Sequence, residues 1–441
     1  MSPLARSVLA MLAPGAVLAG ALLATPAVAG QFTTLASFPG STTSNPNGGA
    51  NPYAGLIDVG GTFYGTTGGG GSNGVGALFS YSAANGLQGL ASFAGPTSAN
   101  TNSNGGAYPY SSLIAVGGTF YGVTIFGGSQ GVGTLFSYSA ANGLQTLASF
   151  GQGNTSAFPV AGLTDVGGTL YGTTDGGGTS PGHGTVYSYD PTTKTITTQA
   201  IFTGANGNSP YAGLIDVNGI LYGATENGGS TFVNATTGSP GHGALFSFNP
   251  ANDAITLLAS FTGSNGARLL GGLIDVNGTL YGTTHDGGST FSSSNVGDGT
   301  LFSYSATNGL KTLVNFTGAN GANPYPSLAD VNGILYGTTN HGGSAGDGTL
   351  FSFDPTSGQL TTLMSFTGAN GALPAASNLL DVGGTLYGTT FYGGSTFSSS
   401  NLGDGTLFSY TLPPASVPEP ASLALLGAGI AGIALARRRR A

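Results

Sequence analysis

The chain has no cysteine and no tryptophan, and only 5% of its 441 residues are charged. Without cysteine, no disulfide can stabilise the fold in an oxidising compartment. The chain has eight basic and 16 acidic residues. The basic residues outside its two ends are Lys194, Arg268 and Lys311. Nucleic-acid binding needs a dense positive surface, so this class of function is excluded. Charge-driven binding of an anionic polymer is disfavoured for the same reason.

Signatures of catalysis are also missing. There is no G-x-S-x-G elbow, and no loop carries a pair of carboxylates placed for acid–base chemistry. The histidines His183, His242, His285 and His341 fall in four successive repeats, so they are not expected to converge on one metal ion. We therefore predict no catalytic residues, no resident metal and no cofactor.

What the sequence has in abundance is glycine, 82 residues, within a motif that recurs seven times. Its Tyr-Gly step begins at Tyr64, Tyr121, Tyr171, Tyr222, Tyr281, Tyr336 and Tyr387. The intervals of about 50 to 60 residues are typical of propellers and repeat arrays. The repeat therefore decides the fold class before any other feature does.

Each repeat contains four short strand-like runs, a to d, separated by turn residues. In the sixth repeat they cover residues 328–331, 334–339, 349–354 and 360–366. Asn-Gly or Gly-Gly joins a to b, as a tight hairpin requires. Residues 31–38 (QFTTLASF) form a d-like run before the first a strand, whereas the last repeat stops at its c strand, residues 407–410. We predict an all-β, seven-bladed β-propeller of four-stranded antiparallel blades, closed by the N-terminal strand.

The two ends carry targeting features. Residues 1–29 are a predicted signal peptide with an A-x-A site at residues 27–29. Residues 30–412 are the predicted propeller, 413–420 a linker, 421–436 a transmembrane helix and 437–441 a basic cytoplasmic tail. The linker holds Pro418, Glu419 and Pro420, and the tail holds Arg437, Arg438, Arg439 and Arg440.

This order of motif, apolar helix and arginines resembles the PEP-CTERM sorting signal of Gram-negative bacteria. The resemblance implies export and cleavage near the PEP motif by an exosortase-type processing enzyme. The protein would be anchored in the inner membrane during sorting and would then reach the cell surface or the extracellular matrix. A permanent single-pass anchor is the alternative.

The repeat itself resembles two families. Leu221-Tyr222, Gly228-Gly229 and residues 245–248 match three features of a kelch blade, but the tryptophan of kelch is absent. It is more similar to the bacterial tandem repeats called GloVer, over residues 31–410. That resemblance implies surface exposure and repeat architecture, with no known activity.

Tyrosines are the candidate ligand-binding residues. Tyr53, Tyr110, Tyr211 and Tyr325 stand at equivalent positions just before strand a, which is the innermost strand of a propeller blade. They should gather near the mouth of the central channel, on the face opposite the a–b and c–d turns. Aromatic faces and hydroxyl groups suit sugar recognition. Packing between neighbouring blades is the alternative role.

Two further features have competing interpretations. Six a strands end in an acid, at Asp58, Asp165, Asp216, Asp275, Asp330 and Asp381. These carboxylates can accept N–H bonds in the turns, or they can form a ring for Ca²⁺. The b–c loops are longest in blades 4, 5 and 7, and residues 289–299 nearly repeat residues 395–405. Such variation indicates either a binding role or recent duplication.

The sequence thus favours a non-enzymatic exported propeller that binds extracellular carbohydrate or a surface protein. A structural component of the matrix or biofilm without a discrete ligand is the first alternative, and a polysaccharide-acting enzyme is the second. The expected partners are an exosortase, polysaccharide or a surface protein, and the membrane through the C-terminal helix.

Overall fold

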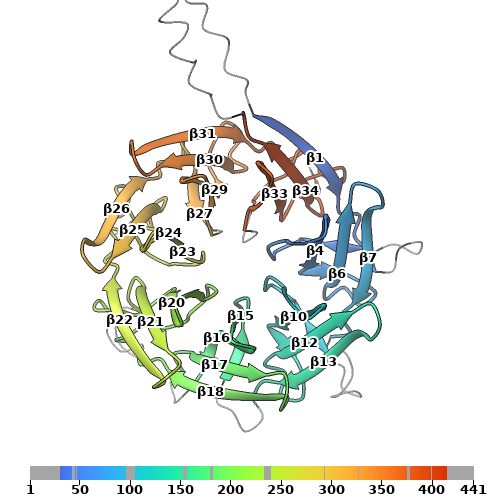
Figure 1. Cartoon of the computed structure of the whole chain (residues 1–441). Helices are drawn as coiled ribbons and strands as arrows, with labels where there is room; N and C mark the ends of the chain where they lie inside the picture. The colour runs from blue at the N-terminus through green and yellow to red at the C-terminus, as the bar shows by residue number, and fades with distance from the viewer. Residues whose placement is uncertain are drawn as a thin grey trace, which may run out of the picture. The chain divides into compact units, whose positions relative to one another are not determined.

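The computed structural model describes residues 30–414, apart from 42–44, 46, 96–104, 152–155, 179–181, 233–239, 293, 326, 375–377 and 399. Residues Gln31–Leu412 form one compact unit. It is an all-β ring of seven blades around a central axis (Figure 1). The predicted seven-bladed propeller is confirmed. The predicted signal peptide, transmembrane helix and sorting residues lie outside the described residues.

Each blade is an antiparallel sheet in the order a, b, c, d from the axis outward. The a strands are β3 (Ile57–Val59), β9 (Ile114–Val116), β15 (Thr164–Val166), β19 (Ile215–Val217), β23 (Ile274–Val276), β28 (Ala329–Val331) and β32 (Leu380–Val382). The b strands are β4 (Thr62–Thr67), β10 (Thr119–Thr124), β16 (Thr169–Gly177), β20 (Ile220–Thr225), β24 (Thr279–Thr284), β29 (Ile334–His341) and β33 (Thr385–Thr390).

The c strands are β6 (Ala77–Ser82), β12 (Thr134–Ser139), β17 (Thr185–Asp190), β21 (Ala244–Asn249), β25 (Thr300–Ser305), β30 (Thr349–Asp354) and β34 (Thr406–Thr411). The d strands are β7 (Gly86–Ser92), β13 (Gly143–Ser149), β18 (Thr195–Ile201), β22 (Ala254–Ser260), β26 (Gly309–Asn315), β31 (Gln359–Ser365) and β1 (Gln31–Ser37). Short strands in four d–a connections pair with an extension of the b strand; they are β2 (Gly49–Ala50) with β5 (Gly69–Gly70), β8 (Gly106–Ala107) with β11 (Phe126–Gly127), β14 (Ser156–Pro159) with β16, and β27 (Ala322–Pro324) with β29.

The ring is closed by its first strand. β1 is the d strand of blade 7, where it pairs antiparallel with β34 from Gln31↔Thr411 to Ser37↔Thr406. The pair contains a register shift at the same place as the c–d pairs of the other six blades. The N-terminal strand therefore has the same pairing and the same register shift as the d strands of the other blades. Closure leaves no open edge between blades 7 and 1.

The core consists of seven clusters, one at each interface between neighbouring blades. At every interface the aromatic residue after a d strand meets a c-strand ring of the next blade, as Phe93 meets Phe136 at 5.0 Å between ring centroids. The closing interface is packed in the same way, with Phe38 against Phe79 at 5.0 Å. Phenylalanine thus fills the space without tryptophan.

The same ring explains the Tyr-Gly step. A Cβ atom on Gly65 would lie 2.7 Å from the ring of Phe79, so only glycine fits under that ring. The corresponding glycine in each of the other blades is also covered by an aromatic side chain of its c strand. The motif that identified the repeat is therefore a packing requirement of the blade core.

Candidate functional site

The d–a connections all run on one face of the ring, which we call the d–a face. Each contains a non-glycine residue with a positive φ, in the left-handed region; these residues are Asn51, Tyr108, Phe158, Ser209, Arg268, Asn323 and Leu373. In blade 2, the N–H of Tyr108 bonds to Val75 O of blade 1 at 2.9 Å, and its carbonyl accepts the N–H of Ile125 at 3.2 Å. The backbone is thus held by both blades, whichever side chain occupies the position.

The four predicted tyrosines converge over the axis of the ring. The Tyr53 hydroxyl is hydrogen-bonded to the Tyr325 hydroxyl and lies 3.5 Å from that of Tyr211. Tyr110 stacks on Tyr53 with 4.4 Å between ring centroids. These residues come from blades 1, 2, 4 and 6, so the contacts cross the channel and do not simply join neighbouring blades. We call them the tyrosine cluster.

Burial keeps Tyr53, Tyr110 and Tyr325 of the tyrosine cluster uncharged. Desolvation is the main reason that the pKa values of Tyr53 and Tyr325 are raised far above the ordinary value for tyrosine, and the nearby tyrosines raise them further. Burial also raises the pKa of Tyr110. These hydroxyls therefore remain protonated, and so able to donate hydrogen bonds, throughout the physiological pH range.

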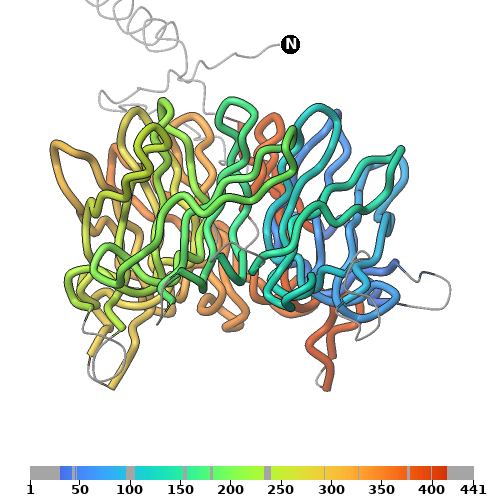
Figure 2. Tube along the Cα trace, turned by 90° about the horizontal axis from the view of Figure 1, so that it is seen from below, coloured from blue at the N-terminus to red at the C-terminus, as the bar shows by residue number. Residues whose placement is uncertain are grey.

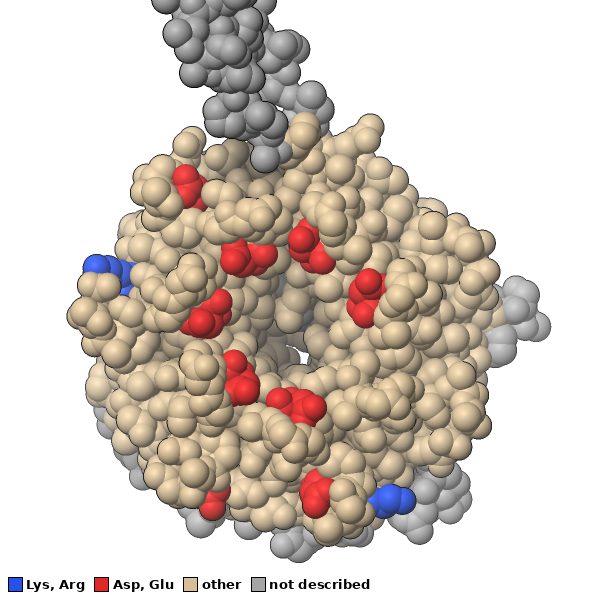
Figure 3. Space-filling view, viewed as in Figure 1, with Lys and Arg blue, Asp and Glu red and all other residues tan. Residues whose placement is uncertain are grey.

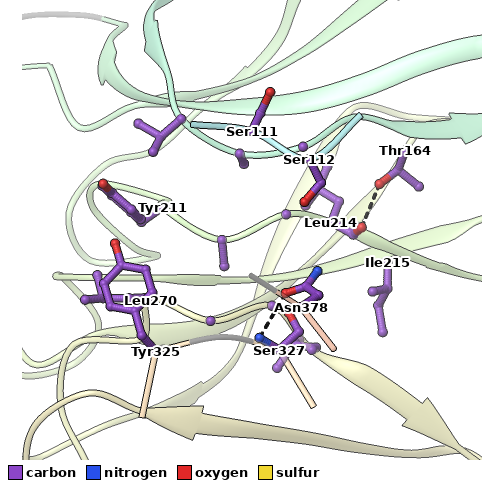
Figure 4. A pocket seen from close by; sticks show the side chains of 18 of the residues that line it. Ser111, Ser112, Thr164, Tyr211, Leu214, Ile215, Leu270, Tyr325, Ser327 and Asn378 are labelled. Atoms are coloured by element: carbon purple, nitrogen blue, oxygen red, sulfur yellow. Dashed lines mark hydrogen bonds between the residues drawn. The ribbon is translucent and has the colours of Figure 1, made fainter. Parts of the chain in front are cut away.

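A cavity of about 370 Å³ lies along the axis beside the tyrosine cluster. Its wall includes one small or amide residue at the start of each of six a strands, at Ser112, Gly162, Gly213, Gly272, Ser327 and Asn378. These positions crowd together, because a Cβ on Gly272 would lie 2.3 Å from the Ser327 hydroxyl oxygen. Figure 4 shows Tyr211 and Tyr325 at one end of the cavity and Thr164 at the other.

The polar groups of this wall are already partly ordered. The N–H of Gly55 donates to Ser112 Oγ at 3.0 Å, and that of Ser327 donates to Asn378 Oδ1 at 3.1 Å. Leucine and isoleucine side chains supply most of the remaining surface. The cavity therefore combines aromatic, aliphatic, hydroxyl and amide groups without a charged residue among those that line it.

Aromatic side chains extend from the tyrosine cluster across blades 7, 1, 2 and 3. We call this row the aromatic strip; its members, in spatial order, are Phe158, Phe126, Tyr108, Tyr110, Tyr53, Phe391 and Tyr392. Successive ring centroids are between 4.4 and 6.1 Å apart. Phe126 is 43% exposed, and the other rings are half-buried.

Sequence reasoning missed five members of the aromatic strip, namely Tyr108, Phe126, Phe158, Phe391 and Tyr392. Tyr108 and Phe158 occupy the left-handed position just before a proline. Phe391 directly follows the last threonine of a b strand, and Phe126 and Tyr392 are the second residues after such a threonine. Aligning the seven repeats at these positions would have shown that aromatic residues cluster in neighbouring blades.

Charged side chains occupy equivalent positions in blades 4 and 5. Arg268 bonds to Glu226 at 2.9 Å and to Asp286 at 3.1 Å. Asp286 also accepts a hydrogen bond from His285 Nδ1 at 2.7 Å, and the His285 ring lies edge-on to Tyr325 at 5.9 Å. We call Glu226, Arg268, His285 and Asp286 the charged cluster. Its ionic groups are paired with one another.

Asp286 is the buried centre of the charged cluster, with a side chain only 5% exposed. Burial alone would raise the pKa of its carboxyl, but the hydrogen bond from His285 and the charge of Arg268 outweigh that effect and hold the pKa below its ordinary value. The carboxylate is thus ionised in the folded protein, as its two donors require.

Two long loops also project from the d–a face (Figure 2). They are residues 289–299 in blade 5 and 395–405 in blade 7, and each is anchored by a phenylalanine over a glycine, Phe291 on Gly263 and Phe397 on Gly368. Val296 and Leu402 are 63% and 60% exposed near the tips. These loops share one structure, which agrees with their nearly identical sequences.

The opposite face is formed by the a–b and c–d turns. Its acidic residues surround the central opening (Figure 3). Five of the six predicted turn acids accept the N–H of the residue three positions on, at 2.7 to 3.0 Å; they are Asp58, Asp165, Asp216, Asp330 and Asp381. The turn-capping interpretation is confirmed at these five. Among the described residues, no three His, Asp or Glu side chains lie close enough to hold a metal ion.

Both ends of the propeller lie on this turn face. Gln31 pairs with Thr411, and the N–H of Leu412 bonds to Gly384 O in the a–b turn of blade 7 at 2.9 Å. The tyrosine cluster is on the other face, as the strand directions predicted. Within the part of the chain that the structure describes, no helix is long and apolar enough to cross a membrane.

The fold and these sites define a closed seven-bladed propeller with one acidic face and one face rich in aromatic residues. The Gloeobacter/Verrucomicrobia repeat model matches residues 96–289 and 231–422, and the chain belongs to this repeat family. The PEP-CTERM protein-sorting motif matches residues 416–440, which implies export, membrane-associated sorting in a Gram-negative bacterium and processing by an exosortase. No curated protein matches the chain.

Two solved structures were found to be similar to the chain. The extracellular domain of a hybrid two component system from B. thetaiotaomicron is 15% identical, with a TM-score of 0.53 over 86% of this chain. The tricorn protease is 13% identical, with a TM-score of 0.39 over 71% of this chain. The chain spans 39% and 26% of the lengths of these two structures. The first likeness supports the propeller architecture alone.

Proposed function

We propose that this exported propeller is a non-enzymatic binding module for extracellular carbohydrate, with its site at the tyrosine cluster and the adjoining cavity. The observation that carries the proposal is the convergence of Tyr53, Tyr110, Tyr211 and Tyr325 beside a cavity of about 370 Å³. That volume lies within the range of about 300–1,000 Å³ that is usual for small-ligand sites.

The chemistry of the site matches a sugar ring. A sugar presents an apolar face of C–H groups and a rim of hydroxyls, which need an aromatic or aliphatic surface and uncharged hydrogen-bonding groups. The Tyr110 ring supplies the first, and the hydroxyls of Tyr110 and Ser112 and the amide of Asn378 supply the second. Protonated tyrosines can both donate and accept, as sugar hydroxyls can.

The position of the last described residues supports an orientation of the d–a face relative to the membrane. The propeller ends at Leu412 on the turn face, and we propose that residues 413–420 are a short linker to a membrane-spanning helix at 421–436. Eight extended residues reach only about 25 Å, so the turn face would be held toward the membrane. The d–a face, with the tyrosine cluster, would then point away from the cell envelope and toward the matrix.

Binding of the purified propeller to the exopolysaccharide of the producing cells tests this function. Residues 31–412 contain every strand of all seven blades, so they can be produced as one unit. Saturable binding by calorimetry is expected, and Tyr110→Ala should weaken it at least about five-fold because one stacking ring is lost. Tyr138→Ala is the control, because Tyr138 stands at the turn-face end of the c strand in the same blade.

Failure to bind any exopolysaccharide fraction would contradict the proposal. It would favour a protein ligand or a structural matrix role, and the tyrosine cluster would then be a brace across the channel. Equal loss of binding in the Tyr110 and Tyr138 variants, with equal loss of stability, would also contradict a discrete site at the cluster.

A further inference from the structure

We propose that the aromatic strip is an extended binding surface for an uncharged polysaccharide chain, several sugar units long, that continues outward from the tyrosine cluster. This inference rests on the proposed function and names its ligand class. The outer members Tyr108, Phe126 and Phe158 carry it, since they lie beyond the residues that line the cavity.

The backbone supplies the first argument. Tyr108 and Phe158 have φ values of 57° and 58°, where a bulky side chain is strained. Blade 1 has Asn51 at the same position, and its amide donates to Phe391 O at 3.0 Å. Blade 6 has Asn323, which donates to His285 O at 2.9 Å. Asparagine suits this backbone because it tolerates the left-handed region and its amide bonds to the neighbouring blade. Tyr108 and Phe158 occupy the same position with side chains for which the described residues show no such bond.

The packing of the rings supplies the second argument. Phe126 lies edge-on to both Tyr108 and Phe158, at 6.0 and 5.8 Å between centroids. Tyr108 is in turn 6.1 Å from Tyr110, which lines the cavity. The rings form a continuous row and are not isolated from one another, so they present apolar surface repeatedly at short intervals. A chain of linked sugar rings has the same character, with one apolar face in each unit.

The hydroxyl groups add the polar half of the match. Among the described residues, the structure shows no hydrogen-bond partner for the hydroxyls of Tyr108 and Tyr110, although both side chains are half-buried. The hydroxyls of Tyr53 and Tyr325, in contrast, bond to each other. Two donors are therefore left along the strip where sugar hydroxyls would pass.

The distribution of charge selects an uncharged chain. Arg268 lies on the d–a face, and it is already paired with Glu226 and Asp286. Lys194 lies in a c–d turn on the opposite face. At the outer end of the strip, Phe158 packs over Gly176 in the extended b strand of blade 3. Among the described residues of the strip, an acidic sugar would meet no unpaired cation to offset the desolvation of its charge, whereas an uncharged sugar needs none.

The test compares fragments of the neutral and acidic exopolysaccharide fractions of the producing cells, each cut to two and to six sugar units. For residues 31–412, the neutral six-unit fragment should bind at least about ten-fold more tightly than the two-unit fragment, because it reaches additional rings. Phe126→Ala and Phe158→Asn should each remove about five-fold of that gain and leave two-unit binding unchanged.

Val296→Ala is the matched control, since it removes an exposed apolar side chain from the same face outside the strip. Phe158→Asn also separates binding from folding, because asparagine fits the left-handed backbone and should leave Tm within about 4 °C of the parent.

Equal affinity for two and six units, unaffected by either strip variant, would overturn the strip while leaving the cavity site. Tighter binding of the acidic fragment would overturn the charge argument. Binding of no fragment would overturn the proposed function, and this inference with it.

Discussion

The two halves of the d–a face are built on the same backbone and differ in what their side chains do. In blades 4 and 5 the variable positions hold Glu226, Arg268, His285 and Asp286, which bind one another. In blades 2, 3 and 7 the same positions hold the aromatic residues Tyr108, Phe126, Phe158, Phe391 and Tyr392. Together with Tyr53 and Tyr110 they form the aromatic strip, whose rings pack at their edges and remain partly exposed. The charged groups of one half are paired with one another, and the rings of the other half leave part of their apolar surface uncovered.

This difference shows how a repeat can gain a site without changing its fold. Each d–a connection is fixed by backbone hydrogen bonds to two blades, so the side chain at its left-handed position is free to vary. Variation at seven equivalent positions places different chemistry around one channel. The position of a binding site is thus set by the ring, and its chemistry by a few residues in each blade.

Removing the closing strand β1 should cause the largest loss of stability, because both halves of the d–a face depend on an intact ring. Deletion of residues 31–37 would expose the c strand of blade 7 and uncover the interface formed by Phe38 and Leu407. The loss should reach several kcal/mol, a large part of the ~5–15 kcal/mol that stabilises an ordinary domain. Thermal unfolding followed by circular dichroism measures it.

A permuted chain is the control for that deletion. Moving residues 31–38 behind Thr411 and joining them with the c–d turn of blade 1, residues 83–85, restores the same strand pair by a local hairpin. This chain should regain most of the lost stability. A deletion variant as stable as the parent would show that β1 does not close the ring.

Changing the pH should affect the stability contributed by the tyrosine cluster and by the charged cluster at opposite ends of the pH scale. Tyr53 and Tyr325 have pKa values raised by burial, so their contribution to stability is complete below pH ~10, the ordinary value for tyrosine, and is lost as the pH rises above it. The double variant Tyr53→Phe, Tyr325→Phe should lose less stability than the parent in this alkaline range. An identical alkaline profile for the two proteins would contradict a buried, protonated cluster.

At acid pH, the dependence of Tm on pH should reflect the charged cluster. The pKa of Asp286 is held below its ordinary value despite burial, so its contribution is present above pH ~4 and is lost as the pH falls through the lowered pKa. Asp286→Asn should flatten the fall in Tm below pH 4 and leave the alkaline limb unchanged. Asp275→Asn, on the turn face, removes the same formal charge outside the charged cluster and is the matched control variant.

The fold could be predicted from the sequence because each blade repeats its own packing requirements. The Tyr-Gly step marks a glycine under an aromatic ring, and the unpaired d-like run at residues 31–38 required a partner at the other end of the chain. Strand limits shifted by only one or two residues. For example, β29 continues to His341 because the d–a segment β27 pairs with it, a contact between parts of the repeat that strand patterning does not contain.

The site was predicted only in part. Strand direction placed Tyr53, Tyr110, Tyr211 and Tyr325 near the axis, but the contacts across it depend on how far each ring reaches into a channel whose width the sequence does not state. The aromatic strip was missed because its members follow no regular spacing. They become neighbours only when blades 7, 1, 2 and 3 are placed side by side in the closed ring.

The most direct test of the account compares two substitutions at one structural position, Tyr108→Asn in the aromatic half and Arg268→Asn in the charged half. Both residues have a positive φ that asparagine accepts. Tyr108→Asn should stay within about 1 kcal/mol of the parent stability and lose at least about five-fold in affinity for the neutral six-unit glycan. Arg268→Asn should lose about 1 kcal/mol with its ion pairs and bind the glycan as the parent does. Unchanged glycan binding by Tyr108→Asn together with reduced binding by Arg268→Asn would contradict the assignment of the binding surface to the aromatic half.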